Sequence, residues 1–578
     1  MKTISLIIAA ALIVPAQLIT AQDKPAQANI PPAAKLLSPA VCGKGVFLFT
    51  LGDQSLGRET FEIRCQPEGY SATGHTELNL PGGAIDLNTT LETDKAGSPL
   101  SSTAKGRVNN SPFEQSVLIK DNVATITNNG KSRELPYQKG TALVGGNIFY
   151  MFQFAMAQYD ATQGGVQQIP IFPNATMKIE RVGRDEVQPA GVAAGGQKAA
   201  FDRYNVTIGL ASFVVWADAQ GRIAAIIVPA QNFNAVREDY KDYAAALKAA
   251  LASKTKTEED YSAPPNASFT AEEVTVQAKG FALAGTLLLP KSGKRPFPAV
   301  IMITGSGQQT RDEALPLAGL EKYRPFRQIA ESLAARGIAV LRVDDRGVGK
   351  STGADTLKTA TSFDFADDVR AEIDYLRKRA DIDPNRIALV GHSEGGIIAP
   401  MVAASDPRIA AIVLMAGTAK RGGAVLADQA RDVLERDPSL TPQERAKKLE
   451  EQQEAIRAIE EDRDAPGLTE RFRSPWMREF LKYDPLATIR KVRQPILILQ
   501  GALDRQVTAE QAAMLEQAAR EAGNKDVTAR VFPGLNHLFL PSKTGAFSEY
   551  TSLETTSIPD DVLNTLGDWL QQKLKVKR

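Results

Sequence analysis

Beyond about residue 272, short apolar runs alternate with amphipathic helical patterns, and this alternation constrains the fold more than any other feature of the sequence. Several of the apolar runs are almost continuous in Val, Ile, Leu and Ala, as expected of strands that are buried on both faces. Strands that alternate with helices predict a mostly parallel sheet with helices packed on both faces. The predicted strands are Ala282–Leu289, Ala299–Thr304, Ile338–Asp344, Arg386–Val390, Ile409–Met415, Pro495–Gln500 and Val527–Phe532.

The helices expected between these strands include Phe326–Arg336, Asp364–Lys378 and Gly396–Ala404. A long polar helical insert, residues 416–485, interrupts the alternation. It contains a capping box, Thr441-Pro442-Gln443-Glu444, with proline at the first helical position. One apolar stripe follows on that helix, formed by Leu449, Ile456 and Ile459. We expect the insert to cover the carboxyl edge of the sheet as a lid.

Residues 36–252 have a different pattern. Short segments of alternating apolar and polar residues are broken by Gly, Pro and Asn, which predicts antiparallel β-structure. Two helical stretches, Ile148–Tyr159 and Tyr240–Leu251, are expected within this region. Residues 253–271 are charged and then proline-rich, as is typical of a linker. The chain is therefore predicted to join a β-rich N-terminal domain, 36–252, to an α/β domain, 272–578.

The first 21 residues have the features of a secretory signal peptide. A basic start is followed by an apolar run from Ile4 to Val14 and then by small residues, with cleavage expected after Ala21 or Ala16. The run is too short to span a bilayer, which needs about 20 residues. We therefore expect a periplasmic or secreted protein, with no stable membrane insertion once the signal is removed.

Cys42 and Cys65 are the only cysteines, and an exported protein meets an environment in which disulfides persist. A turn at Gly52–Ser55 lies midway between two strand-like segments, so a hairpin there would place Cys42 opposite Cys65. One cross-strand disulfide is predicted, with two free thiols as the alternative.

Charge and composition exclude several classes of protein. The chain has 68 Lys and Arg against 67 Asp and Glu, and no long basic run of the kind that nucleic-acid binders carry. Neither cysteine has the neighbours of a zinc site, and we expect no metal and no organic cofactor.

The N-terminal domain has no motif that carries chemistry, and its His75 is expected to be a loop or strand-edge residue. The sequence predicts no oligomeric state.

Two stretches match Gly-x-Ser-x-Gly, the pattern that places a nucleophilic serine on a sharp turn between a strand and a helix. Ser393, in Gly391-His-Ser-Glu-Gly395, directly follows a predicted strand and directly precedes a predicted helix. Ser351, in Gly349-Lys-Ser-Thr-Gly353, lies several residues beyond its strand and no committed helix follows. Ser393 is therefore the predicted nucleophile.

The stretch Gly349-Lys350-Ser351 also matches the end of a phosphate-binding loop. That loop requires a glycine five residues before the Gly-Lys pair, and this chain has Asp344 there. Nucleotide binding is therefore not expected.

A serine hydroxyl needs a base to take its proton, and histidine is the usual base. The chain has only three histidines. His75 belongs to the other domain, and His392 is adjacent to Ser393 and cannot turn back to reach it. His537, in the loop after the predicted strand Val527–Phe532, is therefore the predicted base.

The acid that orients this histidine is expected between nucleophile and base in the chain. Asp504 directly follows the predicted strand Pro495–Gln500, at the carboxyl end where such sheets place function. Asp484 is the competing candidate, but it precedes the strand. Asp504 is therefore the predicted acid.

These residues resemble the α/β-hydrolase superfamily in four motifs: Gly391-His-Ser-Glu-Gly-Gly, Asp344-Asp-Arg-Gly-Val-Gly-Lys-Ser, Gly501-x-x-Asp-x-x-Val and Asn536-His. Thr304-Gly-Ser-Gly307 followed by Arg311-Asp-Glu looks like secreted bacterial carboxylesterases, with dienelactone-hydrolase-like and prolyl-oligopeptidase-like enzymes as near relatives. The resemblance covers about Glu272 to the C-terminus. Many relatives have His-Gly where this chain has Thr304-Gly305, a position whose side chain performs no chemistry.

The resemblance implies an oxyanion hole formed by the backbone N–H of Glu394 together with that of Ser306 or Gly307. It also implies that the Asp344–Gly347 stretch is a structural turn beside the site. Apolar residues near the end of the insert are candidates for an acyl pocket or for core packing: Phe472, Trp476, Met477 and Phe480.

The expected function is hydrolysis of carboxylic esters with small to medium acyl groups, through an acyl-enzyme on Ser393. The expected partner is a small-molecule ester. A serine peptidase or amidase that acts on small peptides or acyl-amino acids is the closest alternative, because the same triad serves both reactions. An alternative from another class is a non-catalytic envelope protein that binds a ligand on a hydrolase scaffold.

Overall fold

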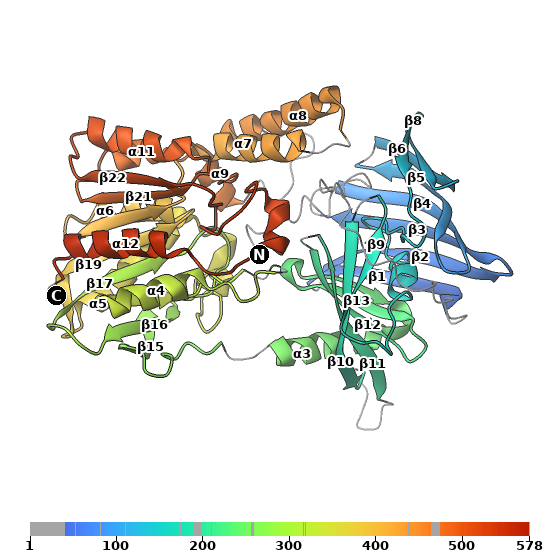
Figure 1. The fold of residues 1–578 in the computed structure, drawn as a ribbon, viewed down its shortest axis with the longest axis horizontal. Helices are drawn as coiled ribbons and strands as arrows, with labels where there is room; N and C mark the ends of the chain where they lie inside the picture. The colour runs from blue at the N-terminus through green and yellow to red at the C-terminus, as the bar shows by residue number, and fades with distance from the viewer. Residues whose placement is uncertain are drawn as a thin grey trace. The chain divides into compact units, whose positions relative to one another are not determined.

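The computed structural model describes residues 41–576, apart from 53, 81–82, 110, 174, 190–197, 210, 256–258, 316, 318, 437–439 and 464–473. The chain forms two compact units, one that ends at Glu259 and one that begins at Asp260 (Figure 1). The predicted signal peptide, 1–21, lies outside the described residues. Within the described part of the chain, no helix is both long and apolar enough to cross a membrane.

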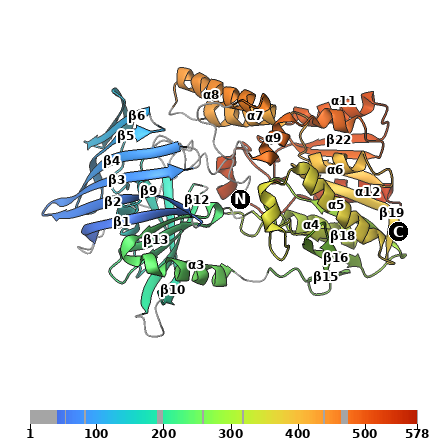
Figure 2. The ribbon, with the colours of Figure 1, turned by 180° about the vertical axis from the view of Figure 1, so that it is seen from behind.

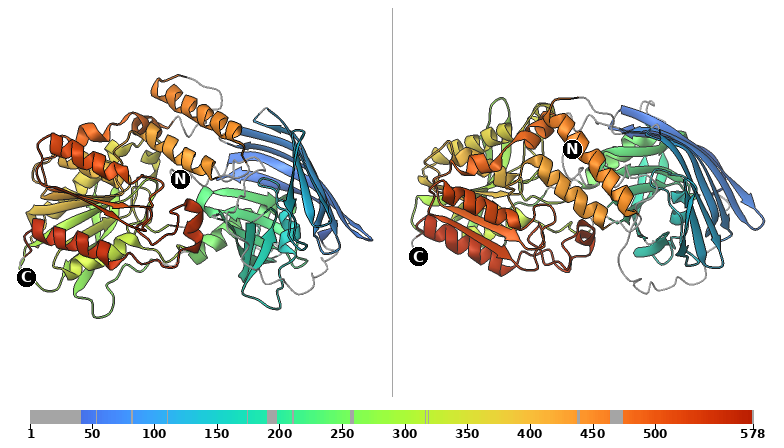
Figure 3. Two further views of the ribbon diagram at one scale, coloured as in Figure 1. Left: turned by 45° about the horizontal axis from the view of Figure 1, so that its top comes forward. Right: turned by 90° about the horizontal axis from the view of Figure 1, so that it is seen from above.

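The N-terminal unit is built on one 14-stranded sheet in which all neighbouring strands are antiparallel, so this region is β-rich as predicted. The sheet curves strongly (Figure 3). Its strand order is β8-β7-β6-β5-β4-β3-β2-β1-β14-β13-β12-β11-β10-β9. The strands are β1 (Gly43–Leu51), β2 (Gln54–Gln66), β3 (Gly69–Leu80), β4 (Gly83–Asp94), β5 (Pro99–Val108), β6 (Ser111–Lys120), β7 (Val123–Asn128), β8 (Lys131–Pro136), β9 (Val166–Ile171), β10 (Ala175–Val187), β11 (Ala199–Ile208), β12 (Ala211–Ala217), β13 (Ile223–Val228) and β14 (Phe233–Arg237).

The helix expected over Ile148–Tyr159 is reduced to a five-residue helix, α2 (Phe152–Met156). Two backbone N–H groups just before it, those of Phe149 and Tyr150, donate to the buried carboxylate of Glu59 instead of starting a longer helix. The aromatic side chains of this segment are buried in the core of the unit rather than confined to one helical stripe. The second predicted helix begins as a 3₁₀ turn, η3 (Glu238–Tyr243), and continues as α3 (Ala244–Thr255); a further 3₁₀ turn is η2 (Pro229–Gln231).

Cys42 and Cys65 form a disulfide, with their Cα atoms 5.7 Å apart. The register of the hairpin differs from the expected one, because Gly43 lies opposite Ile63 and a bulge interrupts the pairing at Phe49. Cys65 therefore lies one residue beyond the position directly opposite Cys42. The expected turn includes residue 53, which is outside the described residues.

His75 is neither a loop nor a strand-edge residue, contrary to expectation. It lies within β3, between Thr60 of β2 and Asn88 of β4. Its Nε2 atom is 2.9 Å from a carboxylate oxygen of Asp86. The alternation of apolar and polar residues in Gly69–Leu80 extends through His75, and this was the signal for a continuous strand.

The C-terminal unit contains an eight-stranded sheet of order β15-β16-β18-β17-β19-β20-β21-β22. The pairs β15–β16 and β16–β18 are antiparallel, and the remaining five pairs are parallel. The strands are β15 (Phe269–Gln277), β16 (Ala282–Pro290), β17 (Phe297–Ile303), β18 (Ala339–Val343), β19 (Ile382–His392), β20 (Ala411–Met415), β21 (Ile496–Gly501) and β22 (Val527–Phe532).

Strand β15 begins inside the expected linker, 253–271, and helix α3 also extends into it at the other end. The linker is therefore shorter than predicted. The strand buries Phe269, Val274 and Val276 but exposes charged residues between them, so its composition is that of an edge strand.

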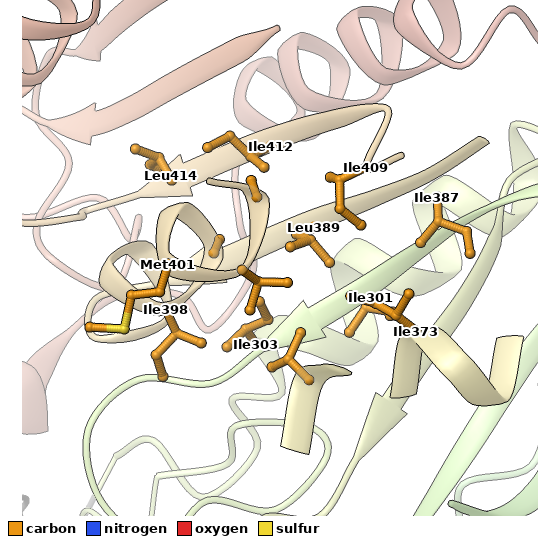
Figure 4. Close-up of a cluster of buried hydrophobic side chains, with 14 of the residues drawn as sticks. Ile301, Ile303, Ile373, Ile387, Leu389, Ile398, Met401, Ile409, Ile412 and Leu414 are labelled. Atoms are coloured by element: carbon orange, nitrogen blue, oxygen red, sulfur yellow. The ribbon is translucent and has the colours of Figure 1, made fainter. Parts of the chain in front are cut away.

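Helices cover both faces of this sheet (Figures 1 and 2). On one face lie α4 (Pro325–Ala335) and α12 (Asp560–Lys573), and on the other lie α5 (Ser362–Arg377), α6 (Gly395–Ala403) and α11 (Glu510–Glu521). Apolar side chains of β17, β19 and β20 pack against Ile373 of α5 and against Ile398 and Met401 of α6 (Figure 4). Two 3₁₀ turns, η4 (Ala354–Lys358) and η5 (Phe547–Ser552), lie in connecting segments.

The predicted insert, residues 416–485, contains α7 (Gly422–Glu435), α8 (Pro442–Glu460) and α9 (Pro475–Lys482), and α10 (Pro485–Ile489) begins at its last residue. The expected capping box starts α8, and Ile456 and Ile459 of the predicted stripe are buried while Leu449 is half-buried. A Cβ atom at Gly422 would lie 2.5 Å from Phe480, and one at Gly423 would lie 2.9 Å from Ile456. Helix α7 therefore packs closely against both α8 and α9.

Candidate active site

Ser393 lies on the tight turn between β19 and α6, with a left-handed φ of 54°. This conformation costs a non-glycine residue about 1–2 kcal/mol, so surrounding contacts have to hold it. The Ser393 N–H donates to the carbonyl of Met415 at 2.8 Å. The flanking glycines are required sterically, because a Cβ atom at Gly391 would lie 2.0 Å from the Gly395 carbonyl oxygen and one at Gly395 would lie 2.2 Å from that of Ile303.

Asp504 follows β21 and contacts His537, which lies in the loop after β22. The Asp504 Oδ2 atom is 2.8 Å from His537 Nδ1, and both side chains are buried. Three further groups donate to the same carboxylate: Gln500 Nε2, and the backbone N–H groups of Gln506 and Val507. With Nδ1 as donor to the carboxylate, Nε2 of His537 is left as the proton acceptor.

The loop that carries His537 is held by several buried groups. The side-chain oxygen of Asn536 accepts hydrogen bonds from the N–H groups of Leu538 and Leu540. The hydroxyl of Tyr323, on a segment more than 200 residues away, donates to the Leu538 carbonyl. No hydrogen bond joins the Ser393 hydroxyl to His537 in the described part of the chain, and such catalytic contacts often tighten only when substrate binds.

The loop after β17 lies directly beside Ser393. A Cβ atom at Gly305 would be 3.3 Å from Cβ of Ser393. The N–H groups of Ser306, Gly307 and Glu394 donate to no protein acceptor within the described residues, whereas the Gly305 N–H donates to Glu313 Oε1 at 2.6 Å. The free amides are thus available to an oxyanion next to the serine.

The side chain of Asp345 holds the loop after β17 in place through two hydrogen bonds. Its carboxylate accepts a hydrogen bond from the Thr304 hydroxyl at 2.8 Å and from the Gln309 N–H at 2.9 Å. Burial raises the pKa of Asp345 to about 8 despite these two donors. The residue belongs to the turn that the sequence predicts as structural, and its contacts position the loop rather than the reacting atoms.

The family described as serine aminopeptidase, S33, matches residues 319–543, a span that includes Ser393, Asp504 and His537. Esterase EstD of Thermotoga maritima is 26% identical over 379 residues, which make up 64% of this chain and 80% of that protein. Putative hydrolase YtaP of Bacillus subtilis is 30% identical over 131 residues, 21% of this chain and 43% of that protein. The C-terminal unit has the α/β-hydrolase fold.

These relatives support a carboxylic ester hydrolase. Two solved esterase structures are similar to part of this chain. The Pyrococcus furiosus esterase PF2001 has a TM-score of 0.37 at 17% identity, covering 54% of this chain and 94% of that chain. Est1E of Butyrivibrio proteoclasticus, solved with bound ferulic acid, has a TM-score of 0.35 at 19% identity, covering 52% of this chain and 99% of that chain.

The competing residues of the hydrolase unit have structural roles. The Ser351 hydroxyl donates to the Asp344 carbonyl at 2.7 Å and accepts from the Ala284 N–H at 2.8 Å. A Cβ atom at Gly349 would lie 2.4 Å from the Asp344 carboxylate, so this stretch is a closed turn. Asp484 caps the N-terminus of α10 by accepting from the Ala487 N–H.

The insert of the hydrolase reaches the nucleophile turn through Glu394. The Glu394 carboxylate accepts hydrogen bonds from Trp476 Nε1 of α9 at 2.7 Å and from the Ser362 hydroxyl at 2.6 Å. The Trp476 ring stacks on Phe480 with centroids 5.2 Å apart, and Met477 is buried beside them. The fourth pocket candidate, residue 472, lies outside the described residues.

Sequence reasoning did not assign a role to several residues around the site. Glu313 and Tyr323 hold the loops after β17 and β22, Gln500 supports Asp504, and the Glu394 side chain binds the insert. The stretch Arg311-Asp-Glu313 was part of the family resemblance, and it was the one available signal for Glu313.

Proposed function

We propose that this protein is a serine esterase in which Ser393 is the nucleophile, His537 the general base and Asp504 the residue that orients the base. The observation that carries the proposal is the buried Asp504–His537 hydrogen bond of 2.8 Å, in a unit whose nucleophile turn holds Ser393 in a strained conformation. Because Asp504 is the acceptor at Nδ1, it would also stabilise the imidazolium that forms when His537 takes the serine proton.

In the proposed reaction, the Ser393 oxygen attacks the ester carbonyl while His537 accepts its proton. The carbonyl oxygen becomes negative, and the free N–H of Glu394 together with that of Ser306 or Gly307 stabilises it. His537 then protonates the leaving alcohol, and the acyl-enzyme remains. Water, deprotonated by the same histidine, attacks the acyl-enzyme and releases the acid, which restores Ser393.

The substrates that we propose are esters with small to medium acyl groups. The Trp476 ring donates a hydrogen bond to Glu394, next to the nucleophile, and stacks on Phe480. These two rings support an apolar acyl site of limited size. The insert, residues 416–485, would act as the lid that carries these rings. The relative named an esterase, EstD of Thermotoga maritima, favours an ester as the substrate.

An amidase or peptidase is the second candidate, and the matching family description, serine aminopeptidase, favours it. Turnover of p-nitrophenyl acetate and butyrate is to be compared with that of aminoacyl-p-nitroanilides. We expect the esters to be hydrolysed at least a hundredfold faster, because an amine is the poorer leaving group and an esterase need not activate it. Equal rates on both would replace the esterase proposal by the amidase.

The nucleophile is tested with a fluorophosphonate probe and two serine variants. Ser393→Ala is expected to abolish labelling and to lower kcat by at least 10⁴-fold. Ser351→Ala is the matched control, because it removes the serine of the second Gly-x-Ser-x-Gly stretch and is expected to keep both labelling and turnover in folded protein. If Ser393→Ala hydrolyses esters as fast as the wild type, the proposed triad is rejected. If the wild type itself is neither labelled nor active, the alternative of a non-catalytic binding protein is favoured.

We also propose that the mature protein is periplasmic or secreted, on the basis of the N-terminal sequence and the Cys42–Cys65 disulfide. Mass spectrometry of protein isolated from the producing cells should show both residues protected from alkylation until a reductant is added. Alkylation of both thiols without reductant would contradict this location.

A further inference from the structure

The residue before the nucleophile, His392, forms a second histidine–carboxylate pair beside the proposed catalytic one. Its Nδ1 atom is 2.9 Å from Glu313 Oε1, and its Nε2 atom is 3.1 Å from the backbone carbonyl oxygen of His537. The rings of His392 and His537 lie with centroids 5.0 Å apart. Glu313 is buried and His392 is nearly so, with side-chain exposures of 5% and 11%.

The partners of His392 determine how many protons it carries. A backbone carbonyl can only accept, so Nε2 must be a donor toward His537. Glu313 Oε1 already accepts the N–H of Gly305 at 2.6 Å, and as a carboxylate oxygen it is an acceptor toward Nδ1 as well. A neutral imidazole has one N–H, whereas this environment calls for two.

The geometry points to His392 as a buried imidazolium paired with Glu313, and to this pair as the clamp that positions the oxyanion loop and the loop of the base relative to Ser393. Three segments meet at the clamp: Gly305 after β17, Ser393 after β19 and His537 after β22. Each would carry one part of the reaction in the proposed function, on which this inference rests. His392 and Glu313 are positioning residues, because they act through these segments and not on the substrate.

The charged groups around His392 agree with this protonation state. Burial alone would lower the pKa of His392, but the charge of Glu313 and the hydrogen bonds to Glu313 and to the His537 carbonyl overcome it, and the pKa is raised. Asp504, which is hydrogen-bonded to His537, adds to the same effect. Because the negative charge of Glu313 balances the positive charge of His392, the imidazolium of His537 can form beside a pair with no net charge.

The first test reads the protonation state directly, and it does not depend on activity. The chain has three histidines, so ¹⁵N-histidine labelling gives three imidazole signals that His75→Gln and His392→Gln assign. At pH 8, we expect the His392 ring to show two N–H nitrogens in the wild type and one in Glu313→Gln. A neutral, single-tautomer His392 in the wild type would overturn the inference.

The second test measures whether the two residues act as one unit in catalysis. Glu313→Ala and His392→Ala are each expected to lower kcat by about ten- to a hundredfold with KM changed less than threefold, because misplaced loops impair the reaction more than binding. The double variant should be no worse than the slower single variant. Losses that multiply in the double variant, or kcat values equal to the wild type, would overturn the clamp.

A control separates this result from the proposed function. His75→Gln removes a histidine that is also paired with a carboxylate, Asp86, but lies in the N-terminal unit, and its kcat should equal that of the wild type. If Ser393→Ala retains activity, the proposed triad fails whatever the clamp variants do. If Ser393→Ala is inactive while both clamp variants are fully active, the clamp alone fails.

Discussion

Both units of this protein bury a carboxylate that accepts several hydrogen bonds, yet only one of these two carboxylates is hydrogen-bonded to a histidine. In the N-terminal unit, Glu59 accepts from the Thr76 hydroxyl and from the N–H groups of Phe149 and Tyr150. In the hydrolase unit, Asp504 accepts from backbone and amide groups and also from His537. The groups that donate to Glu59 have only structural roles. His537, which donates to Asp504 through Nδ1, has a second ring nitrogen, Nε2, that can accept a proton.

The topology of each sheet explains the difference. Antiparallel strands that follow one another in the chain return alternately to opposite edges, so the connections of the N-terminal sheet are divided between its two edges. The parallel strands β17, β19, β21 and β22 all present their carboxyl ends at one edge. The loops that carry Gly305, Ser393, Asp504 and His537 follow these four strands, so functional side chains from distant parts of the sequence can lie together at this edge.

Replacing Asp504 should give the largest effect. Asp504→Asn keeps the shape but removes the charge and allows the wrong tautomer of His537, so kcat should fall by about 10⁴-fold. Asp484→Asn is the matched control, because Asp484 caps α10 and pairs with Arg421, both structural contacts, and its kcat should stay within twofold of the wild type. Steady-state kinetics on p-nitrophenyl butyrate measure both. A loss of less than tenfold in Asp504→Asn would remove Asp504 from the proposed triad.

Replacing Gly305 should give a smaller loss that is also confined to the hydrolase unit. The added Cβ atom of Gly305→Ala would lie 3.0 Å from Glu313 Oε1 and 3.3 Å from Cβ of Ser393. The loop has to move away from the serine, and kcat should fall by about 10²-fold, as for the loss of one oxyanion donor. Kinetics and a thermal melt are recorded together. Unchanged kcat in a variant of unchanged Tm would show that this loop does not contribute to the oxyanion site.

Replacing Glu59 should destabilise the N-terminal unit and leave turnover by folded protein unchanged. Glu59→Ala leaves the N–H groups of Phe149 and Tyr150 without an acceptor in the core, which costs roughly 2–4 kcal/mol. Hydrogen exchange of strand β2 and helix α2, measured on the full chain, should become faster. Slower turnover per folded molecule would link this carboxylate to catalysis and break the contrast with Asp504.

The effect of Glu59→Ala should also depend on pH. Burial raises the pKa of Glu59 from 4.5 to about 8, against donors that favour the charged form. In the folded unit Glu59 therefore keeps a proton that the unfolded chain releases above about pH 4.5. The stabilisation that protonated Glu59 provides is lost as the pH rises through about 8. The difference in unfolding free energy between wild type and variant should be larger at pH 5 than at pH 9. A difference that grows with pH would contradict this sign.

How far the sequence predicts the molecule depends on whether a feature is local. The central strands of the hydrolase unit are almost continuous apolar runs, and the glycines at 391 and 395 mark the turn at Ser393, so both were predictable. The edge strand β15 was not predicted, because charged residues lie between its buried ones. The prediction of a helix over 148–159 was wrong, because Glu59, about 90 residues earlier in the chain, accepts hydrogen bonds from the backbone N–H groups of Phe149 and Tyr150. The link from Glu313 to His392 spans 79 residues, and no local pattern encodes such a contact.

The smallest predicted effect concerns the contact between the insert and the nucleophile turn. Trp476→Phe removes the hydrogen bond to Glu394 but keeps an aromatic ring next to Phe480, so kcat/KM on p-nitrophenyl butyrate should fall about fivefold, which corresponds to about 1 kcal/mol. Trp476→Ala removes the ring as well and should cost a further tenfold on butyrate but little on acetate, because only the longer acyl chain needs the apolar surface. Equal losses on acetate and butyrate would mean that Trp476 only anchors the insert and does not line the acyl site. The hydrolase unit would then resemble the N-terminal unit at this point, with a buried carboxylate whose donors serve the fold alone.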